Sequence, residues 1–157
     1  MFYYLYLDYL KIDTYQVEPF IQRSWATISI GKEAIADHKH LQSHLSFAYY
    51  LRKDPEDSNF VLYDEIYRNE FIPGLFKSKT AIDKKVIKQM TISTAPRVSV
   101  AVKEDDIILF PSKTLHSTER NKSNKERISI SGDITFLSKD SNLLEHLVPN
   151  YSNWKKL

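Results

Sequence analysis

The chain has 157 residues with no cysteine and only 3 glycines, and its 22 Lys and Arg against 20 Asp and Glu leave a formal net charge of +2. The absence of cysteine excludes a disulfide framework, a thiolate metal site and a thiol nucleophile. The small net charge gives no electrostatic argument for a nucleic-acid partner, and the glycines are too few for a phosphate-binding loop. The length suits one domain, which we expect residues 1–157 to form.

The first ten residues, Met1–Leu10, are aromatic but are interrupted by Asp8 and followed by Lys11. They lack the basic start and the small-residue cleavage site of a signal peptide. No segment of the chain reaches the ~18 consecutive apolar residues that a membrane span needs. We therefore expect Met1–Leu10 to be a strand or an edge segment, in a protein that stays in the cytoplasm and has no membrane partner.

Short runs rich in β-branched and aromatic residues, separated by charged turns, dominate the rest of the chain. They are Ser24–Ile30, His44–Leu51, Phe60–Tyr63, Val86–Ser93, Val98–Val102, Ile107–Phe110 and Arg127–Thr135. Short helices are expected at Thr80–Gln89 and at Asn142–Leu147. This pattern favours a mainly β fold with one or two short helices, a β-sandwich or a barrel of the jelly-roll kind.

Two of these runs pair an apolar face with a polar one, because side chains alternate along a strand. In the last run, the polar face carries Arg127, Ser129, Ser131 and Asp133. The opposite face carries isoleucines, which we expect to pack on a core. In the run His44–Leu51, Tyr50 falls on the face that also carries His44, Ser46 and Ala48. The polar face of the last run is exposed either to solvent or to the inside of a barrel, and two polar faces of this kind favour a polar cavity inside a β fold.

Three histidines are candidate metal ligands. His38 and His40 are two residues apart, so on an extended backbone they point the same way and can share one ion. Imidazole suits iron, zinc, copper and nickel. His116, which follows the run Ile107–Phe110, is the natural third ligand. The alternative is that His38 and His40 are solvated residues of a polar loop; His44 and His146 are interpreted as structural or surface residues.

Arg127 is the candidate anion-binding residue. A guanidinium that projects from a strand into a polar cavity can hold a carboxylate with two parallel hydrogen bonds, and Ser129 can add a hydroxyl from the same face. The alternative is that Arg127 forms only a surface ion pair with Glu126 or Glu119.

The order of these features resembles the Fe(II)/2-oxoglutarate-dependent oxygenase superfamily. It is similar in particular to small oxygenases related to prolyl 4-hydroxylases, which are seen in bacteria and tailed phages. The segments SWATISIGKEAIADHKHLQSHLSFAYYL and DDIILFPSKTLHSTERNKSNKERISISGDI carry the resemblance, which extends from Ser24 to about Thr135.

The resemblance implies a double-stranded β-helix, a cupin-like jelly-roll barrel, with Fe(II) as cofactor and 2-oxoglutarate and O2 as cosubstrates. It assigns the metal ligands, and with them catalysis, to His38, His40 and His116. It assigns the binding of the distal carboxylate of 2-oxoglutarate to Arg127, Ser129 and Tyr50. The implied activity is that of a dioxygenase (an oxidoreductase) that hydroxylates an unidentified substrate and releases succinate and CO2.

The chain departs from the common pattern of the superfamily at two places. His40 stands where the usual ligand set of two histidines and one carboxylate has the carboxylate. Either His40 is a ligand, or Asp37 takes that place, or the site prefers another divalent metal, or catalysis has been lost. Ser58 and Asn59 stand where many relatives carry two glycines.

Two other classes of protein remain as alternatives. One is a non-catalytic jelly-roll binding module or phage structural domain, because fold does not determine function. The other is a three-histidine, cupin-type metalloenzyme that does not use 2-oxoglutarate. The segment Asp64–Lys88 is either a lid over the site or a plain surface loop. The substrate is open, as is the oligomeric state, with a homodimer as one option; a phage-encoded protein would act in the host cytoplasm.

Overall fold

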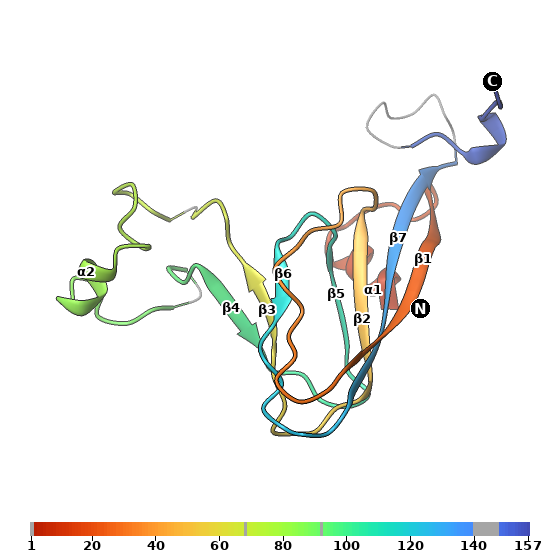
Figure 1. Cartoon of the computed structure of the whole chain (residues 1–157). Coiled ribbons are helices and arrows are strands. Elements are labelled where there is room, and N and C mark those ends of the chain that lie inside the picture. Colours follow the sequence, from red (N-terminus) through yellow and green to blue (C-terminus); the bar gives the residue numbers. More distant parts are fainter. Residues whose placement is uncertain (1, 68, 92, 140–147) are drawn as a thin grey trace.

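The computed structural model describes residues 2–67, 69–91, 93–139 and 148–157, and its strands form two antiparallel sheets (Figure 1). The larger sheet has the order β1-β7-β2-β5, in which β1 is Val17–Ser29, β7 is Arg127–Ser138, β2 is Leu45–Arg52 and β5 is Ile107–Pro111. The smaller sheet has the order β4-β3-β6, with β4 at Arg97–Val100, β3 at Phe60–Tyr63 and β6 at His116–Thr118. The prediction of a mainly β, jelly-roll fold is confirmed.

The register of the larger sheet sets the direction of its polar residues. In the pairing of β2 with β7, Tyr50 lies opposite Ser129, and Ser46 lies opposite Asp133. These residues share the face that turns toward the smaller sheet, and all four are buried. The predicted alternation therefore holds, and the polar face of β7 is the enclosed one.

The expectation that the isoleucine face of β7 packs on a core is correct only for its last part. Ile134 is 2% exposed, whereas Ile128 and Ile130 are half-buried on the outer face of the sheet. The difference arises because all three isoleucines lie on the outer face of the sheet, and Leu7 packs on that face against Ile134.

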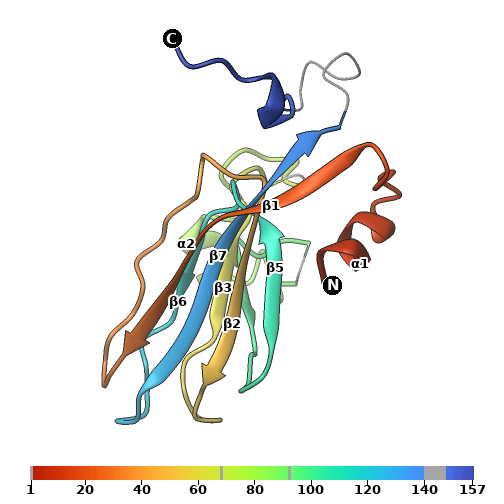
Figure 2. The ribbon, with the colours of Figure 1, turned by 90° about the vertical axis from the view of Figure 1, so that its right-hand side faces the viewer.

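The prediction of a strand at Met1–Leu10 is wrong, because Phe2–Tyr9 is the helix α1 (Figure 2). The first eleven residues contain no Val, Ile or Thr, so no β-branched side chain favours an extended backbone over a helix. Lys11 ends the helix with a positive φ of 56°, and Ile12 N–H donates to Leu7 C=O at 2.9 Å. These are the features of a Schellman C-terminal cap.

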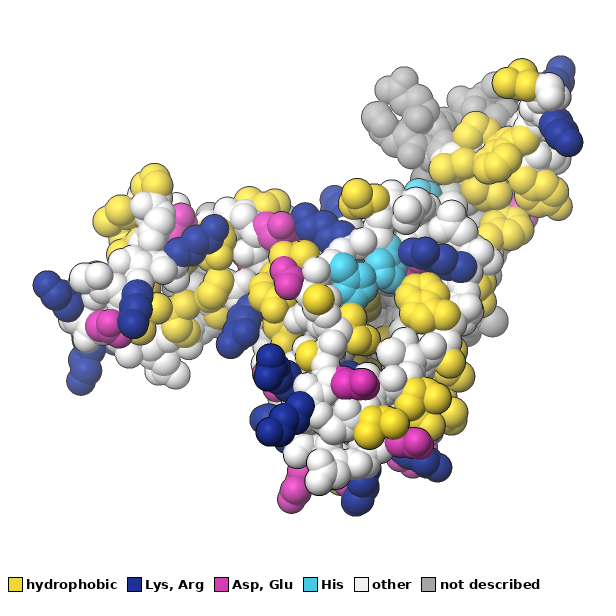
Figure 3. All heavy atoms as spheres, viewed as in Figure 1, with side chains coloured by type: hydrophobic (Ala, Val, Ile, Leu, Met, Phe, Trp, Pro, Cys, Tyr) yellow, Lys and Arg dark blue, Asp and Glu magenta, His cyan; other side chains and the backbone are white. Residues whose placement is uncertain are grey.

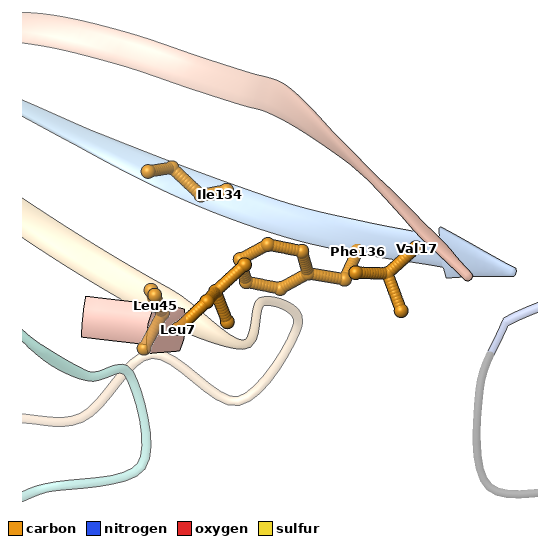
Figure 4. Packing of buried hydrophobic residues seen from close by; sticks show 5 residues of the cluster. All are labelled: Leu7, Val17, Leu45, Ile134 and Phe136. Atoms are coloured by element: carbon orange, nitrogen blue, oxygen red, sulfur yellow. The ribbon is translucent and has the colours of Figure 1, made fainter. Parts of the chain in front are cut away.

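Helix α1 covers the outer face of the larger sheet where that face is apolar. Leu7 packs there in a buried cluster with Val17, Leu45, Ile134 and Phe136 (Figure 4). A second buried cluster lies between the sheets and consists of Ala48, Tyr50, Phe60, Val102 and Phe110. The larger sheet is thus packed on both faces.

The segment between β3 and β4 projects away from the two sheets (Figure 1). It contains the short helix α2, Lys79–Asp83, which overlaps the start of the predicted helix Thr80–Gln89. Ser78 caps α2 by accepting a hydrogen bond from Ala81 N–H. The predicted strand Val86–Ser93 is wrong for the described part of that segment. The N–H groups of Val86 and Ile87 donate instead to Ala81 C=O, at 2.9 and 3.2 Å, and close the end of α2.

The remaining predicted strands are present. Strand β1 begins at Val17, well before the predicted start at Ser24, and the other ends differ by a few residues. The predicted helix Asn142–Leu147 and His146 lie outside the described residues. After β7 the chain pairs again at Val148, and a single 3-10 turn, η1, spans Tyr151–Asn153. Within the described part of the chain, no helix has the length and apolarity to cross a membrane.

Candidate metal centre

The structure brings His38, His40 and His116 together, with one potential ligand atom of each within 4.8 Å of the others. Backbone pairing produces this convergence. His38 N–H donates to His116 C=O at 2.9 Å and His116 N–H donates back at 3.0 Å, so the segment that carries His38 runs antiparallel to β6. Figure 3 shows histidine side chains gathered at the surface of the barrel, among basic and apolar ones.

Each of the three imidazoles uses Nδ1 for a hydrogen bond within the protein. His38 Nδ1 lies 2.8 Å from Ala36 C=O, His116 Nδ1 lies 2.8 Å from Thr114 C=O, and His40 Nδ1 lies 2.6 Å from Asp133 Oδ1. A carbonyl or carboxylate oxygen only accepts, so Nδ1 carries the proton and Nε2 keeps its lone pair. The three Nε2 atoms are therefore the available ligand atoms.

Burial keeps His116 in the form that a metal needs. The ring is 4% exposed and packs against Phe110 and Phe60, at centroid distances of 4.6 and 5.6 Å. Burial lowers its pKa to about 4, an effect that the Thr114 carbonyl opposes and that His38 and His40 reinforce. His116 is consequently neutral near pH 7. The donor set of three imidazoles fits a divalent first-row metal ion such as iron.

Asp133, predicted only to lie on the polar face of its strand, is a further residue of this centre. Its side chain is fully enclosed. It accepts hydrogen bonds from His40 Nδ1 and Ser46 Oγ on Oδ1, and from Arg23 Nε on Oδ2, at 2.6, 2.7 and 2.6 Å respectively. Burial by itself would raise the pKa of the carboxyl, but these hydrogen bonds lower it below its usual value.

A cavity of about 210 Å³ runs between the sheets from the histidines toward Arg127. Its lining includes all three histidines, Trp25 and the predicted residues Tyr50, Arg127 and Ser129. Arg127, Ser129 and Ser131 project into the cavity from one face of β7. The space is polar along β7 and aromatic around Phe60 and Phe110.

Arg127 is 2% exposed and is held by hydroxyl groups. Its Nη2 donates to Ser29 Oγ at 3.2 Å and to Thr118 Oγ1 at 3.1 Å, and its Nη1 donates to Ser58 Oγ. Ser58, at one of the predicted departures from the family pattern, thus contacts the guanidinium. The three neutral partners leave the charge of Arg127 without a carboxylate among the described residues, which suits the binding of an anion in the cavity.

The alternative of a surface ion pair for Arg127 is wrong. Glu126 pairs with Arg52 at 3.2 Å, and Glu119 accepts from Ser99 Oγ at 3.0 Å. Both carboxylates therefore lie outside the contacts of Arg127.

Tyr50 and Ser129 face the same cavity. Tyr50 is 2% exposed, and burial raises its pKa to about 12, although the charge of Arg127 opposes the shift. Its hydroxyl is therefore protonated at neutral pH and can donate a hydrogen bond. Within the described residues it has no hydrogen-bond partner, so it is available to a ligand in the cavity.

His44 and Asp37 lie apart from the three histidines. His44 Nδ1 accepts a hydrogen bond from Phe136 N–H at 2.9 Å, and its ring stacks on Phe136 at an interplanar angle of 4°. Asp37 is exposed and is not part of the group of potential ligands found among the described residues.

A family model described as "Putative 2OG-Fe(II) oxygenase" matches residues 23–133. This range includes the three histidines, Tyr50, Arg127, Ser129 and Asp133. No curated protein matches the sequence.

Solved structures with a similar fold include an oxidoreductase of the 2OG-Fe(II) oxygenase family from Burkholderia pseudomallei, which is 15% identical with a TM-score of 0.53 over 75% of this chain and 45% of that one. AviO1 from Streptomyces viridochromogenes Tue57 is 13% identical, with a TM-score of 0.51 over 83% of this chain and 55% of that one. HygX from Streptomyces hygroscopicus, solved with nickel, 2-oxoglutarate and hygromycin B, is 12% identical, with a TM-score of 0.51 over 82% and 60% of the two chains. The chain spans about half of the length of these proteins.

Proposed function

Since the chain belongs to the 2OG-Fe(II) oxygenase family, whose cofactor is Fe(II) and whose cosubstrate is 2-oxoglutarate, we propose that it is a dioxygenase that hydroxylates a substrate R–H. The overall reaction is R–H + O2 + 2-oxoglutarate → R–OH + succinate + CO2. The observation that supports this most is one cavity that has three imidazole Nε2 atoms at one end and a buried guanidinium at the other. Among the described residues, that guanidinium is held by hydroxyl groups and pairs with no carboxylate.

The metal would be held by Nε2 of His38, His40 and His116. Fe(II), when bound, supplies the redox chemistry that couples decarboxylation of 2-oxoglutarate to oxidation of the substrate by O2. The protein holds each imidazole in one tautomer through its Nδ1 partner, which keeps the lone pairs directed at a shared point.

The distal carboxylate of 2-oxoglutarate would be held by Arg127, with hydroxyl donors from Tyr50 and Ser129. Ser29, Ser58 and Thr118 fix the guanidinium, so it is oriented before the ligand arrives. Phe60 and Phe110 close the side of the cavity near His116 and exclude water from it.

The test is succinate formation from 2-oxoglutarate with Fe(II) and ascorbate. The wild-type protein and His44→Gln, which alters a histidine outside the cavity, should form succinate. His116→Ala should form none, because the shared point then loses one of its three nitrogen atoms. Full turnover by His116→Ala would contradict the ligand assignment.

Binding measurements separate this proposal from the two other classes of protein. Thermal-shift assays with Ni(II), with and without 2-oxoglutarate, should show stabilisation by the metal and further stabilisation by the cosubstrate. A response to metal alone would indicate a three-histidine metalloenzyme that does not use 2-oxoglutarate. No response to either would indicate a non-catalytic jelly-roll module.

A further inference from the structure

Among the described residues, the candidate metal site offers three imidazoles and no carboxylate as ligands, yet a carboxylate contacts the Nδ1 side of one imidazole. Asp133 Oδ1 accepts a hydrogen bond from His40 Nδ1–H, and the two atoms are 2.6 Å apart. The Asp133 side chain is enclosed, and the strand pairing of Ser46 with Asp133 holds both residues on the inner face of the larger sheet. The carboxylate therefore has a fixed position, and the imidazole of His40 separates it from the candidate metal position.

We propose that Asp133 is a positioning residue that acts on the metal through His40, and that it supplies the negative charge that the ligand set lacks. A carboxylate on Nδ1 fixes the ligating tautomer of a histidine and makes its Nε2 a stronger electron donor. The inference rests on the proposed function, because it requires that the three histidines bind a metal ion.

The contacts of the carboxylate support an electrostatic role in addition to a mechanical one. Ser46 contributes a neutral hydroxyl, whereas the cation that pairs with Asp133 is Arg23, whose side chain is 51% exposed. A charge that is half in water is screened and offsets a buried charge only in part. The negative charge of Asp133 is thus neutralised only in part, and it acts on His40 and on the candidate metal position.

Substitutions of Asp133 and of Arg23 should change the metal affinity in opposite directions. Asp133→Asn keeps an oxygen that can accept from His40 Nδ1 but removes the negative charge, so it should weaken metal binding by about 10–100-fold. Arg23→Gln keeps a hydrogen-bond donor toward Asp133 but removes the compensating cation. It should tighten binding by roughly twofold or more at low ionic strength.

The experiment is a titration of each metal-free variant with Ni(II) at pH 8 by isothermal calorimetry, without 2-oxoglutarate. Asp57→Asn is the matched control, because it removes a carboxylate that is also buried, 5% exposed. In the part of the chain that the structure describes, Asp57 forms hydrogen bonds with Ser58 and Lys53 and with none of the three histidines. Its dissociation constant should equal that of the wild type. In an independent readout, the midpoint potential of the Fe(III)/Fe(II) couple should become more positive in Asp133→Asn. The reason is that Fe(III) loses the stabilisation that the negative charge of Asp133 provides.

An unchanged dissociation constant for Ni(II) in Asp133→Asn would overturn the inference. Weaker binding in both Asp133→Asn and Arg23→Gln would also overturn it, because that result would indicate a loss of structure and not an effect of charge. If Asp133→Asn does not fold, Arg23→Gln decides: tighter binding supports the charge effect, and unchanged or weaker binding contradicts it. A wild-type protein that binds no metal would refute the proposed function itself, a result distinct from equal binding by wild type and Asp133→Asn.

Discussion

Nη2 of Arg127 in β7 lies 3.1 Å from Oγ1 of Thr118 in β6, so a cation of the larger sheet is held by a hydroxyl of the smaller one. The contact joins the two sheets at the end of the cavity remote from the histidines. Because the partners that fix Arg127 in position are neutral hydroxyl groups, they do not neutralise the charge of the guanidinium. This is the arrangement that binding of an anionic ligand requires.

Replacement of Arg127 should affect 2-oxoglutarate more than it affects the metal. Arg127→Lys keeps the charge but loses the planar fork, and we expect the dissociation constant of 2-oxoglutarate to rise by about 10-fold or more. Arg52→Gln is the control, because Arg52 pairs with Glu126 on the exposed surface. Calorimetric titration with 2-oxoglutarate in the presence of Ni(II) measures both. Equal affinities in Arg127→Lys and the wild type would remove this role from Arg127.

The hydroxyl of Tyr50 should contribute to binding but not to folding. With a pKa of about 12 it is protonated at neutral pH, and it has no partner among the described residues. Tyr50→Phe should therefore weaken 2-oxoglutarate binding by about 2–10-fold, the loss of one hydrogen bond, with an unchanged melting temperature.

Tyr49→Phe is the matched control for Tyr50→Phe. Tyr49 lies on the opposite face of β2, where its hydroxyl donates to Asp105 at 2.7 Å. Its loss should leave the affinity for 2-oxoglutarate unchanged. Equal effects of the two substitutions would show that the hydroxyl of Tyr50 has no special contact with the ligand.

The polar faces of β2 and β7 could be predicted because alternation along a strand is a local property. The approach of Asp133 to His40 could not, because it depends on the long-range pairing of β2 with β7 and on the path of residues 38–40 across the inner face. The same holds for Ser29 and Thr118, which reach Arg127 from two other strands.

The N-terminal helix shows a different limit of prediction. Aromatic and leucine side chains occur in strands and helices alike, so Met1–Leu10 has no decisive local preference. The outcome depends on what covers the outer face of the larger sheet, and Leu7 of α1 does so against Leu45 and Phe136. The resemblance marks Ser58 only as a departure from the family pattern, and its contact with Arg127 depends on the folded arrangement of residues 69 positions apart.

Protonation of His44 should reduce the stability of the metal-free protein at acidic pH. Burial lowers the pKa of His44 below 6.5, and its Nδ1 already accepts a hydrogen bond from Phe136 N–H. As the pH falls below 6.5, the unfolded chain takes up a proton that the folded chain does not, so the free energy of unfolding decreases. His44→Gln offers an amide oxygen in place of Nδ1 and cannot titrate. Denaturation by urea between pH 7 and pH 5 should show a smaller decrease for this variant; identical decreases would contradict the prediction.

Gly132 should not tolerate a side chain, because a Cβ there would lie 2.6 Å from Cε1 and Cζ of Phe47 and 3.1 Å from the carbonyl oxygen of Arg23. Gly132→Ala should therefore lower the free energy of unfolding by about 1–3 kcal/mol, the usual cost of overpacking. Phe47→Leu combined with Gly132→Ala should recover part of the loss. If the double variant is no more stable than Gly132→Ala, the ring of Phe47 is not the obstacle.

The contribution of α1 to stability can be measured with two leucines of the same helix. Leu7 is 6% exposed in the cluster on the outer face of the larger sheet, whereas Leu5 is 75% exposed. Leu7→Ala should lower the free energy of unfolding by about 2–5 kcal/mol, because it removes buried methyl groups and leaves a cavity beside Leu45 and Phe136. Leu5→Ala should change it by less than about 0.5 kcal/mol, because alanine favours the helix and little buried area is lost. Urea denaturation of both variants tests this directly. Equal, small effects would mean that α1 does not stay packed on the sheet in solution, and that the outer face of β7 is covered by something else.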